Sequence, residues 1–287
     1  MLRRTLLALA GLSLAASLTA CGAGVKSSVE STLDPVAAAA DKSATAGGVK
    51  VSIKATFTTG TATGGITADG VFDEDKGEFT IDLSNLANLA PGGSAQTGLD
   101  GKIKLIYLQE DGHTILYVNA PFLSKVLPGA PTWIKADLDR LAKLLGLDPN
   151  QLLGQTAQNP ADTLDLLRSA GQVEKVGPDI VDGTNVTLYH ATIDLVKAAE
   201  LKGLPEAKVQ ELTASGAPKE IPVDVWIGDD GLLRQLRMSL ETEQAGAPAS
   251  VLMTLKLSDW GSDVSVEAPP ADQVFDATEL ATNLSHA

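Results

Sequence analysis

The chain has 287 residues, a formal net charge of −14 and a hydrophobic fraction of 44%. This length and apolar content suffice for one large domain with its own core or for two small domains. The acidic charge balance argues against nucleic-acid binding and against membrane attachment through a basic patch, because phosphate groups would be repelled. Aromatic residues make up only 4% of the chain, so we expect a core of Leu, Val, Ile and Ala.

The first 21 residues have the order of charged and apolar residues that is typical of an export signal. Arg3 and Arg4 supply positive charge, residues 5–18 form an uncharged apolar run, and small residues lead to Cys21, the only cysteine of the chain. The apolar run is shorter than the roughly 20 residues that a membrane-spanning helix needs. Two interpretations remain open: an ordinary signal peptide followed by a chance cysteine, and a cleavage site at which the cysteine is modified.

The run Leu18-Thr19-Ala20-Cys21 resembles the bacterial lipobox, in which the cysteine thiol receives a diacylglyceryl group. The resemblance implies that residues 1–20 are a lipoprotein signal peptide. The mature chain would begin at Cys21, whose new amino group often gains a further acyl chain such as palmitate. We therefore expect a lipoprotein anchored at the extracytoplasmic face of the cell membrane, since two acyl chains hold a protein there stably.

Gly, Ser and Thr residues after Cys21 favour a flexible segment, and residues 36–42 have the composition of a short Ala-rich helix. We assign residues 21–47 to the lipidated amino terminus and a flexible tether, and residues 48–287 to a single domain. Apolar and polar residues begin to alternate with period two at residues 49–55, as in a strand with one buried face.

The first half of the domain contains a group of strands, predicted at residues 49–55, 66–72, 78–83, 102–109 and 114–118. The last two form the clearest hairpin, because Asp111-Gly112 is a strong turn signal. Both faces of this hairpin are apolar, whereas a sheet with one solvated face alternates more cleanly. A helix layer, a bound apolar ligand or another protein must therefore cover the second face.

Helices and a second group of strands follow. Leucines at helical spacing predict a helix over residues 137–145, and Asp148-Pro149 and Asn159-Pro160 are typical helix starts. Further strands are predicted at residues 173–176, 184–193, 222–227, 232–241 and 250–257, with helices over 194–201 and 205–213 and an irregular tail from Trp260. This order indicates an α+β fold. The simplest architecture is a strongly curved antiparallel sheet, a half-barrel, with helices packed in its concave face.

The second half carries a recognisable succession of strand, acidic turn and Gly-Leu-hydrophobic-Arg. It comprises residues 186–195, Pro222-Val223-Asp224-Val225-Trp226-Ile227, and Asp229-Asp230-Gly231-Leu232-Leu233-Arg234-Gln235-Leu236. This pattern resembles the LppX/LprG group of mycobacterial lipoproteins, and more widely the LolA/LolB lipoprotein carriers and RseB-like periplasmic sensors. The resemblance implies a LolA-like half-open barrel, closed by helices around an apolar cavity that holds acyl chains.

On this basis we expect a carrier that binds acyl chains of a lipid or lipoprotein and moves them across the cell envelope. Its expected partners are the membrane, an acyl lipid and an envelope transporter or other protein. Candidate cavity-lining side chains, chosen by strand position, are Leu105, Tyr107, Leu116, Val118, Leu188, Val225, Leu236, Met238 and Met253. Each would equally fit a dry core. The alternative function is an envelope sensor or assembly protein that binds a partner polypeptide through an exposed apolar patch.

The sequence offers little that indicates catalysis. His113, His190 and His286 lack the spacing of metal ligands, and the chain has no Gly-x-Ser-x-Gly elbow or phosphate-binding loop. Asp137 and Asp139 are expected on different sides of a helix, one of them as its cap. We therefore expect no enzyme activity, no cofactor and no metal site.

Overall fold

The computed structural model describes residues 34–86, 101–121, 132–145, 167, 170–201, 210, 219–244 and 247–278. All of them lie in one compact unit, which begins at Leu33. Within these described ranges, the helices are α1 (Pro35–Ala44), α4 (Leu138–Leu145), α7 (Leu195–Leu201) and a short 3-10 helix (Ala271–Gln273). Among the residues described, no helix is both long and apolar enough to cross a membrane.

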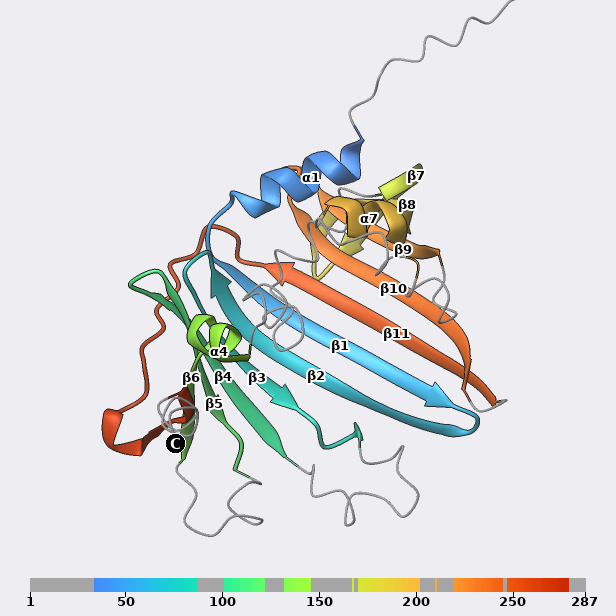
Figure 1. Ribbon diagram of the computed structural model, residues 1–287. Helices are drawn as coiled ribbons and strands as arrows, with labels where there is room; N and C mark the ends of the chain where they lie inside the picture. Colours follow the sequence, from blue (N-terminus) through green and yellow to red (C-terminus); the bar gives the residue numbers. More distant parts are fainter. Residues whose placement is uncertain are drawn as a thin grey trace, which may run out of the picture. The chain divides into compact units, whose positions relative to one another are not determined.

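Twelve strands form a single sheet. They are β1 (Val49–Thr59), β2 (Ala62–Asp73), β3 (Lys76–Asp82), β4 (Lys102–Glu110), β5 (His113–Asn119), β6 (Trp133–Asp137), β7 (Ala170–Val181), β8 (Thr184–Asp194), β9 (Glu220–Gly228), β10 (Leu233–Gln244), β11 (Ala247–Ser258) and β12 (Val274–Asp276). Their spatial order is β12-β6-β5-β4-β3-β2-β1-β11-β10-β9-β8-β7 (Figure 1).

The sheet is curved and unclosed, with β12 and β7 at its edges (Figure 1). This confirms the predicted α+β class and the curved, largely antiparallel sheet. Two strands were not predicted. β6 falls where no element was predicted and ends at the expected helix start, and β12 lies in the tail that was expected to be irregular. These two strands pair in parallel, so the sheet is not antiparallel throughout.

Strand register defines two faces, because directly paired residues point to the same side of a sheet. We call inner the face that carries Val51, Leu255 and Val225, which pack in one core with residues of α1. The outer face carries the alternate residues, among them Ser52 and Lys256, which are register partners. The core therefore lies on the inner face, between the sheet and α1.

Helix α1 is part of this core. Its start is fixed by Asp34, whose Oδ1 accepts hydrogen bonds from the backbone N–H of Val36 at 2.9 Å and of Ala37 at 3.3 Å, with Pro35 in the first turn. Val36 and Ala40 are both 0% exposed. The tether expected over residues 21–47 therefore overlaps the compact unit, and only its part before Leu33 lies outside that unit.

Two hairpin turns are built on Asp-Gly, one of them the predicted turn at Asp111-Gly112. Asp111 and Gly112 have φ of 52° and 77°, and Asp182 and Gly183 have φ of 48° and 82°. Two successive residues with positive φ are the requirement of a type I′ turn, which Asp-Gly meets at low conformational cost. The hairpins β4–β5 and β7–β8 are thus set locally by their turn residues.

The second apolar face of the β4–β5 hairpin is covered by the chain itself. On the outer face, Ile106, Ile115 and Trp133 form a buried cluster with Leu108 and Tyr117. Val266 and Val274, from the segment after β11, pack against this cluster. The outer face is therefore covered by a carboxyl-terminal segment more than a hundred residues away along the chain, while α4, one of the expected helices, contacts β5.

Candidate functional site

The predicted lining residues fall into two groups on the sheet. Leu105 and Tyr107 pair with Val118 and Leu116 on β4 and β5. The other group lies on β9, β10 and β11, where register pairs join Val225 with Leu236, and Met238 with Met253. All eight of these side chains belong to the inner face. Cys21 lies outside the described residues.

Leu188, the ninth candidate, lies on the outer face. It pairs with Trp226 and packs with Trp226, Val181 and Val186 in a small cluster of its own. Its neighbour Tyr189 occupies the inner face instead, because it pairs with Val225. Leu188 is therefore not part of the surface that the other eight candidates share.

A continuous apolar row joins the two groups across the inner face. Register pairs connect neighbouring strands, and each pair joins two apolar side chains. From β9 to β4 the row reads Val225, Leu236, Leu255, Ile53, Ala68, Ile81 and Ile103. Sequence reasoning missed its members on β1, β2 and β3, although the alternation of β1 could have identified Ile53.

Burial divides this face into a dry part and a partly exposed part. Val225 and Leu236 are 0% and 3% exposed and belong to the main core with α1. Ile53, Ile81, Leu105, Tyr107, Val118, Met238 and Met253 are only partly buried. The partly exposed members are the ones that an apolar ligand would cover, whereas Val225 and Leu236 are already packed against protein.

An aromatic pair also lies on the inner face, on β2 and β4. The ring centroids of Phe72 and Tyr107 are 6.2 Å apart, in a tilted arrangement. Both residues pair with Gly77 on β3, and a Cβ at Gly77 would meet the Phe72 ring at 3.1 Å. Burial raises the pKa of the Tyr107 phenol, although the hydrogen bond from Gln109 Nε2, at 2.9 Å, opposes this shift.

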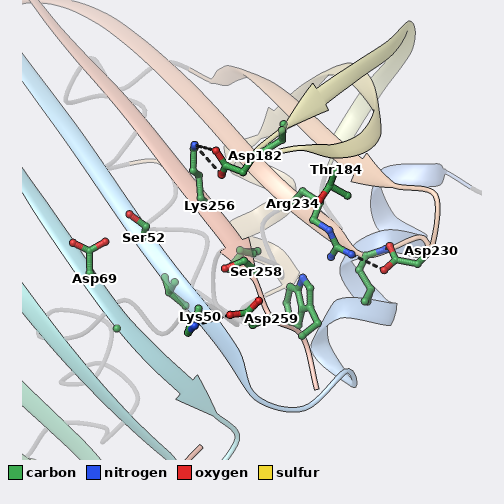
Figure 2. A pocket seen from close by; sticks show the side chains of 16 residues that line it. Lys50, Ser52, Asp69, Asp182, Thr184, Asp230, Arg234, Lys256, Ser258 and Asp259 are labelled. Carbon is green, nitrogen blue, oxygen red and sulfur yellow. Dashed lines mark hydrogen bonds and ion pairs between the residues drawn. The ribbon is translucent and has the colours of Figure 1, made fainter. Parts of the chain in front are cut away.

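A second hollow, of different chemistry, opens on the outer face. This outer-face pocket has a volume of about 710 Å³ and is lined from β1, β2 and β11 and from the β7–β8 and β9–β10 turns (Figure 2). Three ion pairs lie around it: Lys50 with Asp259 at 2.6 Å, Lys256 with Asp182 at 2.9 Å, and Arg234 with Asp230 at 2.5 Å. Sequence reasoning did not identify it.

One group of potential metal ligands comes together at the start of α4. Ligand atoms of His113, Asp137 and Asp139 lie within 4.8 Å of one another, so the expectation that the two carboxylates point apart was wrong. The reason is that Asp137 ends β6 instead of lying within the helix. Asp137 Oδ1 accepts from the backbone N–H of Arg140 at 2.9 Å, and Asp139 Oδ2 from that of Thr114 at 2.7 Å. These bonds give both carboxylates structural roles, and Asp137 is the one of the two that caps the helix.

Residues 169–266 match the family model described as LppX_LprAFG lipoprotein. The residues that carry the resemblance noted from the sequence, 186–195 and 222–236, lie inside this segment, so that resemblance is confirmed there. A relative from Streptomyces griseus, an "uncharacterized 31.2 kDa protein in rplA-rplJ intergenic region", is 27% identical over 191 residues. The alignment spans 64% of this chain and 60% of that relative's length.

Two solved structures are also similar. LprF from Mycobacterium bovis aligns with 82% of this chain and 95% of its own, at 13% identity and a TM-score of 0.45. Lipoprotein LppX from Mycobacterium tuberculosis aligns with 82% of this chain and 100% of its own, at 17% identity and a TM-score of 0.44.

Proposed function

We propose that this protein is a membrane-anchored lipoprotein whose inner face binds acyl chains of a lipid or lipoprotein and carries them across the cell envelope. The main support for the proposal is the unbroken apolar row from β9 to β4, which has partly exposed side chains along it. The match of residues 169–266 to a lipoprotein family supports it.

The driving force would be hydrophobic. Each methylene group that leaves water contributes about 0.8 kcal/mol, so a single long acyl chain would supply enough free energy to offset its ordering. Side chains such as Met238 and Met253 suit this task, because unbranched thioethers adapt to ligands of variable shape. The large apolar surface and the absence of charged residues in the row favour an acyl chain over a polar substrate.

The anchor is part of the same proposal. The signal-like leader and Cys21 would place the protein at the extracytoplasmic face of the membrane, and residues between Cys21 and Leu33 would connect the anchor to the compact unit. With that connection the carrier would stay close to the membrane from which it takes its ligand.

One observation favours the alternative, an envelope sensor or assembly protein that binds a polypeptide. Strand β7 is an edge of the sheet, and Val176 and Ile180 on it are 51% and 65% exposed. An extended segment could add to such an edge through backbone hydrogen bonds. Gly177 and Pro178 interrupt this edge, however, which makes it a poorer template than a regular strand.

Native mass spectrometry of residues 26–287, purified without detergent from an actinobacterial host, tests the proposal. The compact unit is retained in this chain. We expect one acyl lipid per protein, identified after solvent extraction, and reloading of the stripped protein with added lipid. A protein that is isolated empty and also fails to take up added phospholipid would contradict lipid carriage.

A further inference from the structure

The outer-face pocket is separate from the proposed lipid surface. Ser52, Asp69 and Lys256 line it, and they are register partners on the face opposite to the apolar row. Ile53 and Leu255, their neighbours along the chain, belong to that row. The same three strands therefore separate two surfaces, and a ligand in the pocket would be recognised independently of an acyl chain.

The tip of the β7–β8 hairpin forms one wall of the pocket. β7 shifts its register between Lys175 and Gly177, and Gly177 has a φ of 147°. Beyond this irregularity, Asp179 Oδ2 accepts a hydrogen bond from Trp226 Nε1 at 2.8 Å on the outer face. Asp182 then reaches Lys256, whose Nζ donates to both carboxylate oxygens, at 2.9 and 3.0 Å (Figure 2).

The charges around the pocket nearly cancel. Its cations, Lys50, Arg234 and Lys256, each pair with an aspartate. Asp69 is a fourth carboxylate in the lining. With three cations against four carboxylates, on a chain of net charge −14, the pocket has no positive excess to attract an anion. Its paired ammonium and guanidinium groups equally disfavour a cationic ligand.

What the pocket does offer is a mixture of hydrogen-bond donors and acceptors beside an aromatic ring. Ser52, Thr184 and Ser258 contribute hydroxyl groups. The indole N–H of Trp260 donates to the carbonyl oxygen of Leu233 at 2.8 Å, and the ring packs against the main core and also lines the pocket. Arg234 Nη1 is buried and finds no hydrogen-bond acceptor among the described residues, which leaves a donor in the wall to be satisfied.

We propose that the outer-face pocket binds a neutral polyhydroxylated ligand, a short oligosaccharide, against Trp260 and the side chains of Ser52 and Asp69. Hydroxyl groups both donate and accept, so they match a lining in which both kinds of partner alternate. The apolar faces of sugar rings match the part of the Trp260 indole that lines the pocket. The volume of about 710 Å³ lies in the range of small-molecule sites.

The test is saturation-transfer NMR on the full, lipid-anchored protein in a sugar-free detergent. The neutral probes are maltose, cellobiose and lactose, and the charged probes are inorganic phosphate and spermidine. Ser52→Tyr fills the pocket, and Thr56→Tyr is the matched control, four residues further along β1 on the same face but outside the lining. We expect transfer to at least one disaccharide, persistence at high salt, and an affinity at least about tenfold weaker in S52Y than in T56Y.

Three results would overturn the proposal: no transfer to any of the disaccharides, equal transfer in both variants, or binding of phosphate or spermidine alone. The folded state of both variants is checked by their near-ultraviolet spectra and unfolding midpoints. Lipid content serves as an independent readout, because S52Y leaves the inner face unchanged. Loss of sugar binding with normal lipid loading would separate this site from the proposed carrier function.

Discussion

The two faces of the sheet differ sharply although they are built from the same strands. On β11, Leu255 is 3% exposed in the main core, whereas its neighbour Lys256 reaches across the outer face to Asp182. On β1, Ile53 belongs to the apolar row, whereas Ser52 lines a polar pocket. Period-two alternation thus lets one sheet carry two surfaces of different chemistry, and a shift of one residue in register would exchange them.

The difference is not uniform along the sheet. At the β4–β6 end the outer face is also apolar, and the segment containing Val266 and Val274 covers it. Between β2 and β11, around the pocket, the outer face carries ion pairs instead. The comparison therefore predicts that inner-face substitutions act on the core or on lipid binding, while outer-face substitutions between β2 and β10 act weakly on both.

The largest effect on stability is expected for Leu255→Ala. This side chain is 3% exposed, so its truncation leaves a cavity and should lower the free energy of unfolding by about 2–5 kcal/mol. Thr254→Ala, the adjacent outer-face control, should change it by less than about 0.5 kcal/mol. Urea unfolding followed by circular dichroism measures both. Similar losses in the two variants would mean that the faces are not distinct.

A smaller effect is expected at the start of α1. Asp34→Ala removes the acceptor for the backbone N–H groups of Val36 and Ala37 and should cost about 1 kcal/mol. Asp34→Asn keeps an oxygen acceptor, so it should lower the free energy of unfolding by only about a few tenths of a kcal/mol. If both variants unfold at the same urea concentration as the parent chain, α1 does not contribute to the core as described.

The smallest effect concerns pH. Burial raises the pKa of Tyr107 and of Tyr117 above the ordinary value of 10.0. Because the neutral phenols are favoured in the folded state, the associated stability is fully present below about pH 10 and is lost as the pH rises through the raised pKa values. In the Tyr107→Phe variant, the free energy of unfolding should therefore fall less steeply as the pH rises through this range. An unchanged alkaline dependence would contradict the burial of Tyr107.

Much of the succession of strands could be predicted, because β1 begins with alternating residues and the Asp-Gly turns act locally. Leu188 was misplaced because Leu188 and Tyr189 are both apolar, and alternation cannot then assign a face. β6 and β12 were missed because both strands are short, and because β12 pairs with β6, 141 residues earlier in the chain at Val274 and Trp133. Pairing between short strands that lie far apart in the sequence leaves no alternation of apolar and polar residues from which it could be predicted.

The candidate sites were predictable to very different extents. Most of the proposed lipid surface follows from strand alternation, which assigns Leu105, Met238 and Met253 to one face. The outer-face pocket does not, because its walls come from five separate parts of the chain and its ion pairs join residues as distant as Lys50 and Asp259. The contact between His113 and Asp137 depends in the same way on the folding of β6 beside β5.

The most direct test of the account compares two neighbouring residues of β11. Met253→Glu places a charge on the partly exposed inner face, and Leu252→Glu places the same charge on the outer face, where Leu252 is 42% exposed. Native mass spectrometry would measure bound acyl lipid in each detergent-free protein. We predict that M253E loses the lipid while L252E retains it. Lipid retained in M253E, or lost equally in both variants, would contradict binding at the inner face.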